Sequence, residues 1–251
     1  MHYARTPSSL SPMVQPDWPA PAGVYGLMTT RTGGVSAAPW DSFNLAEHVG
    51  DDAARVAENR SRLRQHVPTE PVWLKQVHSA TVVEVGSGLI EADAVWTRHK
   101  RQVCAVLTAD CLPVLFCDHA GSVVAAAHAG WRGLAHGVLE NTVAAMQVPP
   151  GEVLAWMGAA IGPLAFEVGD DVRQAFIERH PEAADAFVPH PSGVPGKWLA
   201  DIGQLARIRL THAGVHAIYG GGRCTFNEAD TFYSYRREGV TGRMASLIWL
   251  E

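Results

Sequence analysis

Three side chains of metal-binding type lie at or just after the ends of short apolar stretches. His78 is near the end of "VWLKQVHSA", Cys111 follows "CAVLTAD", and His128 ends "VVAAAH". Each stretch is typical of a buried strand, and strand ends often meet at one edge of a sheet, where proteins place binding sites. We therefore expect these three side chains to lie together in the folded chain.

Two chemistries suit this set of residues. Two imidazoles and one thiolate supply three ligands to Zn²⁺ and leave a fourth position open, which is the pattern of a catalytic zinc site. Zinc in such a site lowers the pKa of its bound water to about 7, and the same donor set also accepts copper. Without a metal, Cys111 could act as a nucleophile, with one histidine as base and Asp110 or the other histidine orienting it.

Composition limits the class of protein. The chain has 251 residues, a formal net charge of −5, and four cysteines without a CxxC pair. The cysteine pattern predicts a cytoplasmic protein with reduced thiols, and the negative net charge argues against a protein that coats nucleic acid. No apolar run approaches the roughly 20 residues of a transmembrane helix, so we expect no membrane-spanning segment. Cys104 and Cys117 have apolar neighbours, so we expect them to be core residues.

Other polar segments are candidates for substrate contacts. Gly130 and Gly133 bracket a strand-to-helix turn beside Arg132, which could bind an anion or could form a plain tight turn. Arg31 in "RTGGVS" and Asn44 in "FNL" could contact a ligand, although an ordinary loop explains the glycines equally well. The final basic segment indicates either a pocket wall or a solvated hairpin; it contains Tyr235, Arg236, Arg237 and Arg243.

The pattern of apolar residues predicts one α/β domain after an N-terminal arm. Residues 1–22 are rich in proline and predict a loosely ordered arm, while 23–251 show no linker. We expect strands at 24–30, 71–78, 81–85, 94–97, 103–107, 113–117, 122–127, 153–161, 231–235 and 245–250. We expect helices from Asp51 or Asp52 to about 67, within 130–146, at 170–180 and at 198–213. Strands and helices mix without strict alternation, which indicates mixed sheets covered by helices.

Several motifs together resemble one known family. They include "TRTGGVS", "FNLAEHVGDD", "WLKQVHSATV", "ADAVWT", "TADCLPVLF", "AHAGWRGLAHGV", "GAAIGP" and "FYSYRREGVTGRMASLIWL". Over about 24–250 the chain is similar to the bacterial YfiH family, whose members have been called laccase-like polyphenol oxidases, purine nucleoside phosphorylases and peptidoglycan editing factors. The resemblance implies a single catalytic domain over 23–251 with a layered α-β-β-α sandwich, similar to the cysteine-hydrolase fold of deamidating toxins.

The resemblance also implies an activity and a set of site residues. His78, Cys111 and His128 fall on the family's metal-binding and catalytic positions. Members are associated with zinc, sometimes copper, and with phosphorolysis of adenosine, inosine and methylthioadenosine plus deamination of adenosine. On this basis we expect a small-molecule substrate that is contacted by Arg31, Asn44, Asp110 and Arg132.

Two alternatives remain at this point. One is an amidase that removes L-serine from muramyl conjugates in peptidoglycan precursors, a role also attached to the family. The other is a non-catalytic zinc-binding module in which Asp110 closes the coordination.

Where relatives commonly carry cysteine after "IGP", this chain has Leu164 and Ala165, which weakens a copper oxidase interpretation.

Overall fold

The strands at the centre of the molecule are buried on both faces, as their apolar sequences predict. The computed structural model describes residues 13–251. Every residue of β4 (Val103–Thr108), β5 (Leu112–Asp118) and β6 (Val124–Ala129) is buried. Strands that are covered on both sides have continuous apolar runs rather than alternating ones, which is why these three could be recognised from sequence.

Three sheets are formed. The largest has the order β11-β7-β5-β6-β3-β2, the second is β1-β12-β4, and the third is β8-β10-β9. Their remaining strands are β1 (Val24–Met28), β2 (Val82–Glu84), β3 (Ala94–Thr97), β7 (Val153–Met157), β8 (Glu167–Gly169), β9 (Phe187–Pro189), β10 (Lys197–Ala200), β11 (Ala217–Gly220) and β12 (Met244–Leu250). The pairs β11–β7 and β2–β3 are parallel and the other strand pairs are antiparallel, so the six-stranded sheet is mixed.

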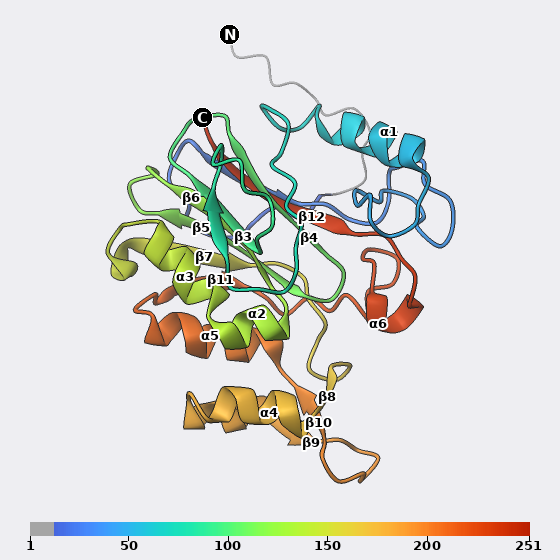
Figure 1. The fold of residues 1–251 in the computed structure, drawn as a ribbon, viewed down its shortest axis with the longest axis vertical. Coiled ribbons are helices and arrows are strands. Elements are labelled where there is room, and N and C mark those ends of the chain that lie inside the picture. Colours follow the sequence, from blue (N-terminus) through green and yellow to red (C-terminus); the bar gives the residue numbers. More distant parts are fainter. Residues whose placement is uncertain (1–12) are drawn as a thin grey trace.

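Several helices pack on one face of the six-stranded sheet, and a single helix lies beside the sheet β1-β12-β4 (Figure 1). The helices are α1 (Ala53–Leu63), α2 (Trp131–His136), α3 (Val138–Ala145), α4 (Asp170–Ile177), α5 (Ile202–His212) and α6 (Tyr235–Glu238), with short 3₁₀ helices η1 (Pro150–Glu152) and η2 (Pro181–Ala186). Helix α1 begins after Asp52, whose carboxylate accepts hydrogen bonds from the amides of Ala54 and Arg55, as an N-cap should. No helix within 13–251 is long and apolar enough to cross a membrane.

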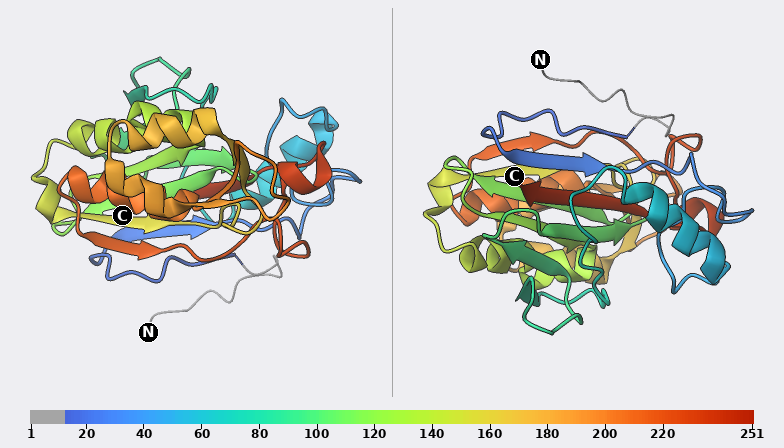
Figure 2. Two further views of the ribbon diagram at one scale, coloured as in Figure 1. Left: turned by 90° about the horizontal axis from the view of Figure 1, so that it is seen from below. Right: turned by 90° about the horizontal axis from the view of Figure 1, so that it is seen from above.

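The strand residues alternate between separate cores, and this produces the layers. In β4, Cys104 and Val106 pack between the two larger sheets, while Val103, Ala105 and Leu107 pack on the opposite side. The other face of the six-stranded sheet packs against α2, α3 and α5. The view from above in Figure 2 shows α1 beside one end of β12, where Leu63 packs in the same core as Leu27 and Leu247. The predicted α-β-β-α sandwich with mixed sheets is therefore confirmed.

Several local predictions were wrong. Residues 71–78, expected as a strand, form only isolated bridges at Val72 and Lys75. Residues 231–235, also expected as a strand, lead into helix α6, and residues 198–200, expected in a helix, belong to β10. The helix expected within 130–146 is two helices, because Gly137 has a φ of 96° between α2 and α3, a conformation that interrupts helical hydrogen bonding and suits glycine. Strand β7 ends at Met157, before the expected 161.

The predicted N-terminal arm is only partly described. Residues 1–12 lie outside the described part of the chain. Within 13–22, Val14 exchanges two backbone hydrogen bonds with Met28, at 2.8 and 2.9 Å, and Trp18 packs against the core between the sheets. The indole of Trp156 also donates a hydrogen bond to Asp17. Residues 13–22 thus contact the domain at Val14, Asp17 and Trp18.

Candidate active site

The corner between β4 and β5 presents Cys111 at one end of the stacked sheets. Asp110, directly before it, has a φ of 89°, a strained conformation that needs support from its surroundings. Its carboxylate accepts hydrogen bonds from the hydroxyl of Thr225 at 2.6 Å and the amide of Arg236 at 2.7 Å. Both oxygens are occupied, so Asp110 fixes the corner that presents the thiol.

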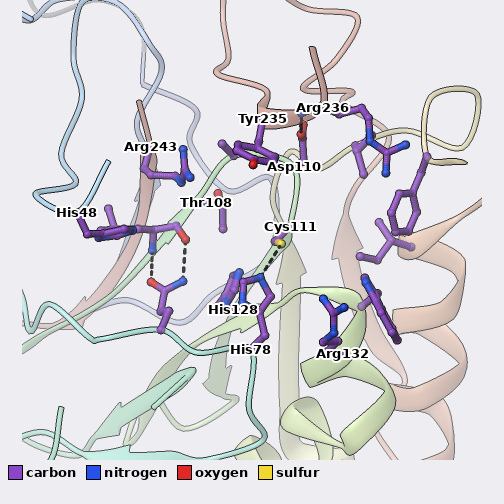
Figure 3. Close-up of a pocket in the computed structure, with 17 residues that line it drawn as sticks. His48, His78, Thr108, Asp110, Cys111, His128, Arg132, Tyr235, Arg236 and Arg243 are labelled. Carbon is purple, nitrogen blue, oxygen red and sulfur yellow. Dashed lines mark hydrogen bonds between the residues drawn. The ribbon is translucent and has the colours of Figure 1, made fainter. Parts of the chain in front are cut away.

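The structure brings His78 and His128 to the same corner (Figure 3). The ligand atoms of His78, Cys111 and His128 all lie within 4.8 Å of one another, and His78 Nε2 is 3.7 Å from Cys111 Sγ. The two imidazole rings meet edge to face with centroids 4.8 Å apart. His128 lies in β6, but His78 lies in a loop with a φ of 60° rather than at the end of a strand.

Asp93 is a site residue that the sequence did not indicate. This fully buried carboxylate accepts hydrogen bonds from His128 Nδ1 at 2.8 Å, from the amide of His78 at 2.9 Å, and from the amide and hydroxyl of Ser79 at 2.6 and 2.7 Å. Burial disfavours its charged form, but the bonds from His128 and Ser79 outweigh burial and lower its pKa to about 2. Because Asp93 is ionised, His128 Nδ1 carries the proton and Nε2 is left free to act as a ligand.

The thiol and the buried histidine form a charged pair. Burial raises the pKa of Cys111, but the charge and hydrogen bond of His128, with a contribution from His78, outweigh it and lower the pKa to about 6. Burial lowers the pKa of His128, but the Cys111 thiolate and Asp93 raise it to about 9. In the metal-free protein at neutral pH, a thiolate therefore faces an imidazolium.

Gly130 allows the three side chains to approach the start of α2. A Cβ atom at this position would lie 2.7 Å from Cδ2 of His78 and 3.0 Å from Sγ of Cys111. Such distances are shorter than ordinary contacts, so any larger residue would displace one of the two side chains. The glycine of "GWRG" is therefore required by the site itself.

A cavity of about 530 Å³ opens above the three side chains, a size typical of small-molecule sites. Arg132, Arg236 and Arg243 lie around it, with Tyr235 near Asp110 and His48 near Arg243 (Figure 3). Further lining residues are Gln76, Leu107, Thr108, Ala109, Trp131, Ile161, Phe166 and Ile202. The final basic segment thus contributes to a pocket wall, one of the two roles considered from its sequence.

Two residues expected to contact substrate lie elsewhere. Neither Arg31 nor Asn44 lines the cavity. Arg31 pairs with Glu238 at 2.7 Å. Asn44 is fully buried and accepts a hydrogen bond from the amide of Arg243 at 3.0 Å. Both side chains hold loops in place, and Asn44 thereby positions the backbone of a residue that does line the pocket.

The other two expected contacts line the cavity in different ways. Arg132 is exposed, lies 4.5 Å above the ring of Trp131, and has no hydrogen-bond or ion-pair partner within residues 13–251. Asp110 is occupied by Thr225 and Arg236. His48 could not have been found from sequence, because nothing near it in the chain indicates that its loop folds back to the pocket.

The donor set fits a metal ion on the evidence of the side chains themselves. Two imidazoles and a thiol of lowered pKa match known zinc ligands, and a carboxylate behind one histidine is the usual support of a ligating imidazole. Cys104 and Cys117 are fully buried and belong to the core between the sheets, apart from this group. His78, Cys111 and His128 could therefore hold a metal, with the cavity adjoining them.

Comparisons with known proteins agree on one family. Residues 26–251 match a family described as multi-copper polyphenol oxidoreductase laccase. The chain is 58% identical over 237 residues to purine nucleoside phosphorylase PA4543 of Pseudomonas aeruginosa, covering 94% of this chain and 97% of that protein. It is 52% identical over 246 residues to purine nucleoside phosphorylase YfiH of Escherichia coli, covering 96% and 100%.

Solved structures give the same result. The crystal structure of protein NMB0706 from Neisseria meningitidis matches with a TM-score of 0.91 and 54% identity, covering 95% of this chain and 99% of that one. YlmD from Geobacillus stearothermophilus matches with a TM-score of 0.89 and 31% identity, covering 98% of each chain. As its motifs predicted, the chain belongs to the YfiH family, described as multi-copper polyphenol oxidoreductase laccase.

Proposed function

We propose that this protein is a metal-dependent purine nucleoside phosphorylase acting on adenosine, inosine and methylthioadenosine, and that it also deaminates adenosine. The observation that carries the proposal is the meeting of His78, Cys111 and His128 beneath a cavity that three arginines line. The names of the relatives in Pseudomonas aeruginosa and Escherichia coli support the same activity.

We assign zinc as the metal, with copper as the alternative that metal analysis would distinguish. His78, Cys111 and His128 would hold the ion. Asp93 would keep Nε2 of His128 available by accepting a hydrogen bond from the protonated Nδ1. Bound zinc would supply a Lewis acid at the reacting centre. The remaining requirements of the reaction fall on the chain's own side chains.

Phosphorolysis requires a site for an anion. A phosphate oxygen forms a bond to C1′ of the ribose while the bond from C1′ to the purine nitrogen breaks, and the departing base takes a proton. Arg132 is suited to bind phosphate, because its guanidinium has no hydrogen-bond or ion-pair partner within the described chain and contacts only the ring of Trp131. Arg236 and Arg243 also line the cavity and add positive charge, which stabilises a bound oxyanion.

Other lining residues suit a nucleoside. Phe166 and Trp131 offer apolar rings for the base. The hydroxyl of Thr108 is buried and has no hydrogen-bond partner among residues 13–251, so a ligand hydroxyl or ring nitrogen would satisfy it. Burial lowers the pKa of His48, and the charges of Arg243 and Arg60 add to this effect, so its neutral ring both donates and accepts at pH 7.

A second candidate function is supported by the arrangement of Cys111, His128 and Asp93. A thiolate paired with an imidazolium, whose other nitrogen is bound by a carboxylate, is the arrangement of a cysteine nucleophile with its base and orienting group. Such a site would attack an amide carbonyl. This supports the removal of L-serine from muramyl conjugates as the alternative activity.

The decisive experiment measures hypoxanthine released from inosine, with and without phosphate, by the zinc-loaded protein. We expect release only with phosphate, loss of release in Cys111→Ser, and retained release in Cys117→Ala as the matched cysteine control. Equal release without phosphate, or full activity of Cys111→Ser, would refute phosphorolysis at this site. Separate incubations measure inosine formed from adenosine and L-serine freed from a muramyl L-serine conjugate.

We also propose that the protein works in the cytoplasm. All four cysteines are free thiols, and Cys111 is needed as a thiolate in both chemistries. Thiols remain reduced in the cytoplasm and are readily oxidised outside it. Cell fractionation followed by detection of the protein tests this assignment, and recovery from an oxidising compartment would overturn it.

A further inference from the structure

A second group of metal-binding side chains lies outside the pocket described above. The ligand atoms of His180, Glu182 and His212 all lie within 4.8 Å of one another, the same bound that holds for the pocket histidines and cysteine. None of the three lines the pocket above Cys111. They adjoin a separate cavity of about 570 Å³, which His180 and His212 line.

We propose that His180, Glu182 and His212 bind a divalent transition-metal ion and that Zn²⁺ suits them best. Two imidazoles and one carboxylate are a known zinc ligand set. Donor atoms about 2.0–2.2 Å from one tetrahedral ion lie roughly 3.3–3.6 Å apart. The observed donors are at most 4.8 Å apart, so each separation exceeds this spacing by no more than about 1.5 Å. The cavity beside them leaves room for water as the remaining ligand.

The ends of two helices also favour a cation at this place. The last turn of α4 continues to His180, whose amide donates a hydrogen bond to the carbonyl of Phe176 at 3.0 Å. His212 is the last residue of α5, and its ring stacks on that of His180 with centroids 4.0 Å apart. Two helix C-termini thus meet, and each carries partial negative charge.

The state of the imidazoles suits ligation. Burial lowers the pKa of His180, the charges of His212 and Arg209 lower it further and that of Glu182 raises it, so the net effect favours the neutral ring. His212 Nε2 contacts the carboxylate of Glu182. A neutral imidazole and a carboxylate beside a second imidazole are the forms in which these side chains bind metals.

Two arginines near the group would oppose a cation, but another carboxylate offsets them. Arg179 and Arg209 both pair with Glu140, at 3.7 and 2.5 Å. Glu140 lines the same cavity as His180 and His212, and its Oε2 has no hydrogen-bond partner among the described residues. The ion would therefore lie near the negative carboxylates of Glu182 and Glu140 as well as near the two arginines.

A metal here would join segments that are distant in sequence. His180 and Glu182 belong to the segment of α4 and η2, whereas His212 ends α5. Helix α5 begins at Ile202, which lines the pocket above Cys111. The ion would thus tie the far end of a helix whose first residue forms part of the substrate cavity.

The test counts metal ions bound by the untagged full-length chain. Each variant is stripped with a chelator, dialysed against buffered Zn²⁺, and analysed for zinc per chain. We expect two ions in the wild type and one in His212→Asn. The matched control is His216→Asn, which changes an exposed histidine four positions later and should leave two. Cys111→Ser should leave one ion, and its combination with His212→Asn should leave none.

The deciding result is the difference between His212→Asn and His216→Asn. Equal zinc content in these two variants would overturn the second site, whatever the pocket binds. Glu182→Ala, at an exposed position, gives an independent reading if His212→Asn fails to fold by circular dichroism. Phosphorolysis should be unchanged in His212→Asn, because this residue is outside the pocket above Cys111. The experiment can therefore refute the second metal site without refuting the proposed function, and the reverse.

Discussion

The replacement Asp93→Asn tests whether the buried carboxylate organises the site. One oxygen of Asp93 accepts from His78 and His128, and the other accepts from Ser79 and Val77. Asparagine keeps one oxygen, so an amide group must face one of these two sets of donors. If the amide faces His128, Nδ1 must become an acceptor and the ring proton must move to Nε2, the nitrogen that we propose as a metal ligand.

The size of the effect follows from the bonds lost. At least two hydrogen bonds to a charged group disappear, each worth about 1.5–3 kcal/mol, so the free energy of unfolding should fall by about 3 kcal/mol or more. For a chain of this length that corresponds to a decrease in Tm of at least about 6 °C. Loss of a carboxylate behind a metal ligand should weaken zinc binding by about 10–100-fold.

The assay combines thermal denaturation with zinc affinity measured by competition with a chelating dye. Asp118→Asn is the matched control, since Asp118 is also buried and accepts hydrogen bonds from Ser122 and Val123 but lies at the far end of β5 from Cys111. It should lower Tm without changing zinc affinity or turnover. Unchanged zinc affinity in Asp93→Asn, despite a lowered Tm, would refute the organising role of this carboxylate.

Three further predictions concern the cysteines and the glycine of the site. In chelator-treated protein, alkylation of Cys111 by iodoacetamide should reach half its maximal rate near pH 6, since its pKa is lowered to about 6 and only the thiolate reacts; a midpoint near pH 9 would contradict this. Gly130→Ala should sharply reduce zinc binding and turnover, as the new methyl group would contact His78 and Cys111; wild-type zinc content would argue against the close approach. Cys117→Ala should lower Tm by about 2–4 °C, because it removes about 1 kcal/mol of core packing, and should leave turnover unchanged. A reduced kcat at wild-type Tm would show that Cys117 is not simply a core residue.

Local sequence predicted that His78, Cys111 and His128 lie together, because each of them accompanies an apolar run. Such runs also indicated β4, β5 and β6 within a residue or two of their observed ends. The support behind His128 was not predictable in this way. Asp93 lies in "EADAVW", where two carboxylates, Glu91 and Asp93, separated by one alanine resemble an ordinary surface turn.

The contacts of the long loop at 31–50 were also beyond local reasoning. Arg31 pairs with Glu238, a partner 207 residues away, and Asn44 binds the amide of Arg243. No spacing within the loop indicates either partner. The glycines and polar side chains of the loop therefore suggest a ligand contact for Arg31 and Asn44 that the structure does not place at the cavity. His48 lines the pocket but could not be predicted, because its neighbours in the pocket come from distant parts of the sequence.

The central place of β12 in the three-stranded sheet has a consequence for how the chain folds. It lies between β1 and β4, two strands that precede it by many residues in the chain. Neither β1 nor β4 can pair with β12 until β12 has emerged during synthesis. Pairings over such sequence distances form slowly, and an unpaired strand edge can associate with other chains. Because Arg243 directly precedes β12, we expect the part of the pocket wall that Arg243 forms to assemble late in folding.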